Sequence, residues 1–463
     1  MKKIVAAMLP LLLALAGCAT YAPHPLPTEP SLLKSVPQVG SAAADRQSSA
    51  RPATHPFNPA DGLDMTGVAI LAVANNPDLR AARDERGIAA SQLMAAGILP
   101  NPQLTAGLDH PFNVGPGYVD AFNLGLNYDV GSLVTRSAAI AAARSASRKV
   151  DWSILWQEWQ VAQKARLLFI HSIGEEKVRH LLREYRTLLA DRYKRASRAM
   201  AQGNLTIDAV SANLAELQGV EGRLAELERR HSQTTHDLNA LLGLAPEVSL
   251  SLTGSAEVPA IDEGAARDLI DQLPHRRPDL IALQAGYESQ EEQVRQAVLA
   301  QFPALNIGLT RARDTSDINT YGFGVNLTLP IFDRNQGNIA IARATRQRLY
   351  DEYQARLNGD YSEARGILDQ IALMQRQYQQ VADAILPLEK TVKTAEMALA
   401  AGNIEFATFT TLRASLFEKR LEALALEQAL LEQRAILQTV LGTDFRGTTD
   451  TPQILPVLKG EKP

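Results

Sequence analysis

The 463-residue sequence predicts a mainly α-helical protein that also carries strands of a membrane β-barrel. Three observations support this class. Apolar and polar residues alternate with the period of a β-strand in several short stretches. Long proline-free stretches have the composition of helices, and the whole arrangement occurs twice along the chain. We therefore expect an internally duplicated chain of long helices with a small amphipathic sheet.

Strands are predicted at 103–110, 119–130, 304–311 and 321–331. Each alternating run of about seven to ten residues approaches the ~9–11 that a tilted strand needs to cross a bilayer. One face of each strand is apolar, and Asn, Gly and Thr occupy the other. The residues predicted to face lipid are Phe122, Leu124, Leu126, Tyr128, Leu305, Ile307, Leu309, Phe323, Val325, Leu327 and Leu329.

The duplication relates the two halves of the chain at a period of roughly 200 residues, which is too long for a solenoid repeat. Pro77-Asp78-Leu79 matches Pro278-Asp279-Leu280, and Gly203-Asn204-Leu205 matches Gly402-Asn403-Ile404. Each copy reads as helix, strand, loop, strand, long helix, turn and long helix. The first repeat spans 62–246 and the second spans 276–445.

The helices of each repeat are predicted from proline and glycine positions. A first helix from Asp61, its N-cap, to Ala96 precedes the first strand pair. The proline-free stretch from Ser132 to Ala201 predicts a helix of ~100 Å. After a Gly-Asn turn, a second helix continues to Leu242. Apolar residues recur every seven positions there, which indicates antiparallel coiled-coil hairpins. These positions are Val210, Leu217, Leu224, His231 and Leu238, and in the second repeat Phe409, Leu416, Ala423, Leu430 and Leu437.

The remaining segments frame the repeats. Residues 1–17 have the charged start and short apolar run of a signal peptide. Cys18, the only cysteine, follows Leu15-Ala16-Gly17 and resembles the lipidated cysteine of a bacterial lipoprotein, so we expect a diacylglycerol and an acyl chain on it. Residues 18–61 read as a Pro- and Ser-rich tether, and 446–463 as an irregular tail. The linker 247–275 is expected to hold a short strand at 248–252 and a helix at 263–271.

Composition and motifs exclude several functions. The net charge of −4 provides no basic surface for nucleic acid. No Walker loop, zinc-protease motif or nucleophile elbow occurs, so we predict no enzyme, cofactor or metal site. His231 and His236 are five positions apart and do not share a helix face. Trp152, Trp156 and Trp159 share one helical stripe, which indicates packing between helices.

The strands point to a conduit. One chain contributes four membrane-length strands, which cannot close a barrel, and an open sheet edge is not tolerated in lipid. The barrel must therefore be shared between copies, with about eight or twelve strands in total. The helices are too long to lie within the membrane, and we expect them to project from it as a tube.

The motifs resemble the TolC family of outer-membrane efflux factors across roughly residues 60–445. The resemblance rests on Arg276-Arg277-Pro278-Asp279-Leu280, on GVNLTLPIFDRNQG ending at Gly337, and on the paired Gly-Asn turns. The run from Leu99 to Leu104 and LPIFDRNQG are most similar to the heavy-metal, cobalt–zinc–cadmium branch. The resemblance implies a lipid-anchored homotrimer with a twelve-stranded barrel in the outer membrane of a Gram-negative bacterium and a helical tunnel in the periplasm.

The resemblance also implies partners and a tip. A periplasmic adaptor (membrane fusion protein) and an inner-membrane pump, of the resistance–nodulation–division class, would deliver metal cations or small toxic organic molecules for passive conduction. The tip residues expected to meet the adaptor are Gly203, Asn204, Leu205, Thr206, Asp208, Gly402, Asn403, Ile404, Glu405 and Phe406. Some family members carry aspartates at the tip where this chain has Thr408 and Thr411. The resemblance therefore does not imply an acidic gate in this chain.

Two other functions fit the pattern. The same fold serves as the exit duct of type I protein secretion. A non-conducting structural lipoprotein could bridge the periplasm with similar coiled coils, but it would not require four amphipathic strands of bilayer length.

Overall fold

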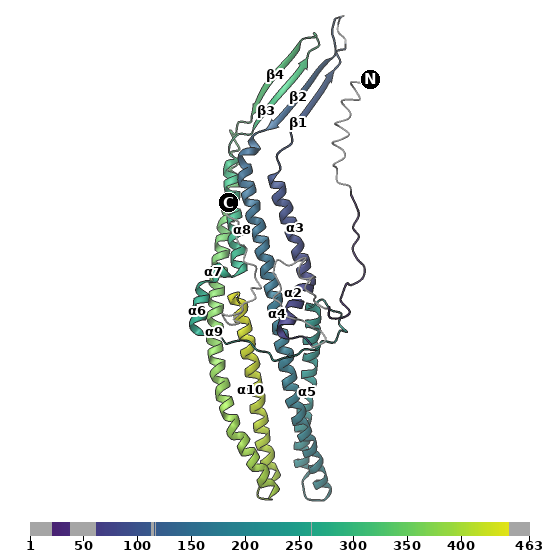
Figure 1. Cartoon of the computed structure of the whole chain (residues 1–463), viewed down its shortest axis with the longest axis vertical. Helices are drawn as coiled ribbons and strands as arrows, with labels where there is room; N and C mark the ends of the chain where they lie inside the picture. The colour runs from purple at the N-terminus through teal and green to yellow at the C-terminus, as the bar shows by residue number, and fades with distance from the viewer. Residues whose placement is uncertain (1–20, 38–61, 113–114, 116, 261, 444–463) are drawn as a thin grey trace.

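The computed structural model describes residues 21–37, 62–112, 115, 117–260 and 262–443. The molecule is elongated, with a small sheet at one end, long helices below it and two helical turns at the other end (Figure 1). Most of the chain is helical, as predicted. In the described part, no helix is both long and apolar enough to span a membrane.

The sheet contains β1 (Gln103–Asp109), β2 (Ala121–Asp129), β3 (Leu305–Arg313) and β4 (Asn319–Leu327) in that order, and every neighbouring pair is antiparallel. The central pairing joins the two repeats, with Leu126 opposite Leu309. The predicted fourth strand was placed too late. The strand starts two residues earlier than expected and ends at Leu327, opposite Leu305, the first residue of β3.

Two very long helices descend from the sheet. α4 (Gly131–Ala201) has 71 residues and agrees with the predicted proline-free stretch, whereas α9 (Gln336–Ala400) has 65 residues and continues through Pro387. α5 (Ile207–Leu241) and α10 (Phe406–Leu441) return antiparallel to them and form the two hairpins of Figure 1.

The prediction of a single helix before the first strand pair was wrong. The structure has α2 (Met65–Asn75) and α3 (Pro77–Gly97). Asn76 separates them, because its Oδ1 accepts from the Leu79 N–H at 3.0 Å and caps α3, whose first residue is proline. Asp64 caps α2 by accepting from the Gly67 N–H, whereas the predicted cap, Asp61, lies outside the described residues.

The linker forms α6 (Glu263–Asp271), at the predicted bounds, followed by α7 (Leu273–Arg276) and α8 (Pro278–Leu299). The expected strand at 248–252 is reduced to one parallel bridge between Leu63 and Leu252.

Part of the expected N-terminal tether packs on the helical body. The Leu33 N–H donates to the Gly243 carbonyl at 3.0 Å, and the Leu33 carbonyl accepts from the Ala245 N–H at 2.8 Å. Val36 packs against the core cluster that includes Phe169 and Leu242. Backbone pairing and apolar contact therefore hold this part of the tether at the level where α2, α4 and α5 meet.

Candidate functional site

One face of the sheet is apolar and exposed. The register places Leu104, Leu126 and Leu309 side by side across β1, β2 and β3, and Leu309 faces Phe323 on β4. Phe323 is 68% exposed and Val325 57%. The predicted lipid-facing residues share this face, except Leu329, which follows the end of β4. Exposed apolar surface of this kind requires an apolar medium or a partner.

The opposite face is polar and built from small residues. The Thr105 hydroxyl donates to the Gly125 carbonyl at 3.3 Å. A side chain at Gly308 would lie 2.3 Å from the Asn127 Oδ1, so glycine leaves room for the asparagine of the neighbouring strand. If the apolar face meets lipid, this face lines a polar interior.

The outer edges of the sheet lack a partner strand within the described part of this chain. β1 and β4 each pair on one side only, with β2 and β3 respectively. An unpaired backbone N–H or C=O in hydrocarbon costs several kcal/mol. The sheet is therefore incomplete as a membrane structure without strands from other chains.

The two hairpin turns share one geometry. Gly203 and Gly402 have φ of 76° and 74°. The Asn204 N–H donates to the Ala199 carbonyl at 2.9 Å, and the Asn403 N–H to the Ala398 carbonyl at 2.8 Å. These bonds are the long-range bonds of a Schellman motif, which requires a left-handed residue, usually glycine.

The turns differ in what they expose. The first presents Leu205 and Ile207, and Ile207 is 68% exposed. In the second, Ile404 and Phe406 pack against the cluster around Phe409. The other predicted tip residues are exposed, namely Gly203, Asn204, Thr206, Asp208, Gly402, Asn403 and Glu405. The structure therefore places all ten predicted tip residues at or beside the two turns, α4–α5 and α9–α10, which lie at the same end of the molecule (Figure 1).

Halfway along the helices lies a buried ion-pair network that we did not predict. Arg277, which is 3% exposed, donates from Nε and Nη2 to both carboxylate oxygens of Asp279 at 2.8 Å. Its Nη1 lies 3.1 Å from the Asp360 Oδ1 and 3.2 Å from the Val440 carbonyl, and its guanidinium lies 4.6 Å from the Trp156 ring. One side chain thus joins α8, α9, α10 and α4. The sequence showed Arg277 and Asp279 only as part of a family motif.

Asp360→Asn is expected to stabilise the protein at pH 8 and to have little effect near pH 4. Burial raises the pKa of Asp360 to about 6, even though Arg277 opposes the shift. The folded state therefore binds the proton more tightly than the unfolded chain. Proton binding to Asp360 therefore stabilises the folded state. This stabilisation is complete below the ordinary aspartate pKa and is lost as the pH rises through about 6. The pKa shift corresponds to roughly 2–3 kcal/mol of folding stability that the native protein loses at pH 8. The amide in Asp360→Asn does not ionise, so the variant would keep this stability at pH 8.

Thermal unfolding followed by circular dichroism between pH 4 and pH 8 measures this difference. Asp369→Asn, an exposed acid on the same helix, is the matched control. A loss of stability in Asp360→Asn at pH 8 would mean that attraction to Arg277 outweighs the cost of burial.

Other titratable groups join helices through ion pairs. The His171 Nε2 lies 3.0 Å from the Glu432 Oε1, and this contact raises the pKa of the imidazole. His231 lies 3.1 Å from the Glu175 Oε2, whereas His236 is exposed. Within the described ranges, no three His, Cys, Asp or Glu side chains are placed to hold a metal ion. Cys18 lies outside these ranges.

The tryptophan stripe packs between helices. Trp159 is buried and its Nε1 donates to the Thr439 carbonyl at 3.3 Å, and Trp156 lies against Arg277.

Comparisons with known proteins agree with this arrangement. Residues 269–443 match the family model "Outer membrane efflux protein". The "Cobalt-zinc-cadmium resistance protein CzcC" of Cupriavidus metallidurans is 25% identical over 394 residues, which cover 84% of this chain and 92% of that protein. The "Multidrug resistance outer membrane protein MdtP" of Escherichia coli is 24% identical over 379 residues, covering 75% of this chain and 74% of that protein.

Similarity to solved structures extends over almost the whole chain. A crystal structure of CusC, from a study of folding and transmembrane channel formation, superposes with a TM-score of 0.69 at 17% identity. The alignment covers 92% of this chain and all of that chain. At this identity the likeness establishes the fold.

Proposed function

We propose that the chain is an outer-membrane efflux channel subunit of a tripartite pump and that three copies form a lipid-anchored channel for heavy-metal cations. The match of residues 269–443 to the outer membrane efflux protein model and the similarity to CzcC support this proposal. The barrel would hold twelve strands, four from each copy. The six hairpins would form a tube that crosses the periplasm and meets the adaptor at its tip.

The two open edges of the sheet are the observation that supports this proposal. Each copy offers β1 on one side and β4 on the other, so identical copies arranged around an axis would pair β4 of one with β1 of the next. Closure removes every unpaired backbone group from lipid. The apolar face then meets hydrocarbon, and the polar face with its glycines lines the lumen. A structural lipoprotein would have no use for such a sheet.

The hairpin turns fit the contact with the adaptor. They lie at the end of the molecule opposite the membrane sheet, and the first exposes Leu205 and Ile207 beside the acid Asp208. An adaptor would cover this apolar surface, and the inner-membrane pump would be of the proton-driven resistance–nodulation–division class.

We base the proposed substrate on CzcC, because it aligns over a larger share of its own length than MdtP does. CzcC carries cobalt, zinc and cadmium in its name and aligns over 92% of its length, whereas MdtP, named for multidrug resistance, aligns over 74%. Among the described residues, no three His, Cys, Asp or Glu side chains are placed to hold a metal ion, and we expect the pump to select the substrate. Expression in a strain that lacks the outer-membrane component of a metal pump tests this assignment. Restored resistance to drugs without restored resistance to zinc, cobalt or cadmium would refute it.

Mass and conductance measured on one detergent-purified sample test the channel itself. We expect a trimer, a lipid adduct on the peptide that begins at Cys18, and small or flickering currents in a planar bilayer from a tip that is closed at rest. Substituting Asp208 and Glu405 with alanine is expected to raise the conductance, because both exposed acids lie at the turns that form the tip. Asp369→Asn, far from the turns, serves as the control. A monomer, or a trimer that stays silent after the tip substitutions, would contradict the proposal.

A further inference from the structure

Two arginines interrupt the apolar face of the sheet. Among the described strand residues of that face, Arg311 and Arg313 on β3 are the only charged ones. Both lie at the end of the strand that is farthest from the helices (Figure 1). If the helices reach toward the adaptor and pump, this end meets the outer leaflet of the membrane.

Arg313 is already engaged within the chain. Its Nη2 and Nε donate to the Asp120 carbonyl at 2.8 and 3.2 Å, and its Nη1 lies 3.6 Å from the Asp317 Oδ1. The guanidinium also lies 5.6 Å from the Phe122 ring. Arg313 therefore ties the two outer loops together.

Arg311 lacks such partners. Its guanidinium lies 5.4 Å from the Tyr321 ring, and no acidic side chain of the described residues lies within ion-pair distance of it. Its cross-strand neighbours are Leu124 on β2 and Tyr321 on β4. Because β3 is an inner strand, a strand of a neighbouring copy would pair about 10 Å away. The exposed guanidinium of Arg311 thus points from an apolar face without a counter-charge.

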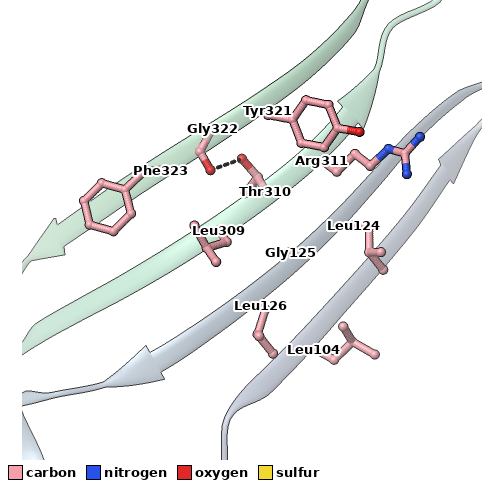
Figure 2. A pocket seen from close by; sticks show the side chains of 10 residues that line it. All are labelled: Leu104, Leu124, Gly125, Leu126, Leu309, Thr310, Arg311, Tyr321, Gly322 and Phe323. Atoms are coloured by element: carbon pink, nitrogen blue, oxygen red, sulfur yellow. Dashed lines mark hydrogen bonds between the residues drawn. The ribbon is translucent and has the colours of Figure 1, made fainter.

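An apolar groove begins at this arginine. Its volume is about 610 Å³, and it crosses all four strands of the sheet. Figure 2 shows Arg311 and Tyr321 toward the loop end, with Leu309 and Phe323 toward the helix end and Leu126 and Leu104 across the sheet. The backbone at Gly125 and Gly322 forms part of its lining.

We infer that this groove binds a phosphate-bearing lipid of the outer leaflet, with an acyl chain along the leucines and Phe323 and a phosphate on the Arg311 guanidinium. Guanidinium groups match phosphate geometry, and arginine at a membrane interface extends its head toward the headgroups while its stem stays in the apolar region. Basic sites between apolar surfaces bind anionic headgroups in the same way. The inference rests on the proposed channel, because it requires the apolar face to meet lipid.

Native mass spectrometry of the purified full-length oligomer measures the binding. The probe is a multiply acylated, diphosphorylated glucosamine disaccharide lipid, compared with the same lipid after removal of its phosphates. We expect Arg311→Gln to weaken binding of the phosphorylated lipid about fivefold, the effect of one cationic side chain near a membrane surface. Removing the phosphates should weaken binding to the native protein by a similar factor and should have little effect on the variant.

Arg365→Gln is the matched control, because Arg365 also lies 5.4 Å from a tyrosine ring, that of Tyr361, but on helix α9. It should bind the lipid like the native protein. The inference would be overturned if Arg311→Gln bound the phosphorylated lipid as tightly as the native protein. It would also be overturned if the native protein bound the lipid equally well with and without its phosphates. Binding of inorganic phosphate without the lipid would also overturn it. The oligomer mass and the conductance of the same sample test the proposed channel separately. If the native protein forms a conducting trimer but does not distinguish the phosphorylated lipid, the lipid site is refuted and the channel is not.

Discussion

Replacing Arg277 with methionine is expected to destabilise the protein by about 3–5 kcal/mol, the usual cost of removing one member of a buried ion pair. Methionine would fill much of the space, but the carboxylates of Asp279 and Asp360 would remain buried without their cation. The Val440 carbonyl would lose its donor, and the Trp156 ring would lose its guanidinium neighbour. Thermal unfolding at pH 8 measures the loss.

The adjacent arginine provides the control. Arg276 is exposed, and among the described residues its guanidinium reaches the Gln272 side chain at 3.4 Å and the Thr443 hydroxyl at 3.5 Å. Arg276→Met should therefore change stability by no more than about 0.5 kcal/mol. Equal losses in the two variants would show that the network contributes nothing beyond surface charge. The loss in Arg277→Met should also shrink as the pH falls toward 4, because burial raises the pKa of Asp360 to about 6 and its protonation removes one of the unpaired charges.

Phe417→Ala is expected to loosen the contact between the two hairpins at a cost of about 3–5 kcal/mol. The Phe417 side chain is 4% exposed and stacks on Tyr185 of α4, with ring centroids 3.9 Å apart and an angle of 10° between the planes. Leu182 and Leu189 of α4 and Val220 of α5 complete this cluster. The nearby bonds between hairpins are exposed ion pairs such as Arg223–Glu418, each of which contributes at most about 1 kcal/mol.

Hydrogen exchange locates this effect. Amides of α4 near Tyr185 and of α10 near Phe417 should lose protection from exchange in Phe417→Ala, while the amides of the sheet should remain protected. Phe417→Leu retains most of the apolar volume and should recover much of the stability. Uniform loss of protection along the chain would instead mean that the substitution unfolds the whole molecule.

The sheet and the long helices could be predicted because their signals are local. Period-two alternation fixes which side of a strand is apolar, and the observed register places Leu126, Leu309 and Phe323 on one face as that alternation requires. The absence of proline between Ser132 and Ala201 corresponds to an unbroken α4. The repeated Gly-Asn turns reappear as the same Schellman motif at Gly203 and Gly402.

The errors arose where a local contact outweighed the pattern around it. Asn76 and Pro77 divide a stretch that is helical on both sides, because a capped proline start is more stable there than a continuous helix. β4 ends at Leu327, opposite the first residue of its partner strand β3, although the apolar alternation continues to Ile331.

The contacts that no local pattern reveals are those between distant segments. Arg277 meets Asp360 and Val440 only in the folded chain. Leu33 lies in a Pro-rich stretch with no periodicity, yet its backbone pairs with Gly243 and Ala245. Arg311 reads as the end of an alternating strand, and only the register shows that it shares the apolar face with Leu309.

The pairing of β2 with β3 has a consequence for how the molecule is made. Tyr128 lies opposite Ile307, so the centre of the sheet joins residues separated by the entire first hairpin and the linker. Such non-local pairing slows folding, because a long loop must close before the pairing contributes any stability. We therefore expect the helices, whose contacts are local, to form before the sheet.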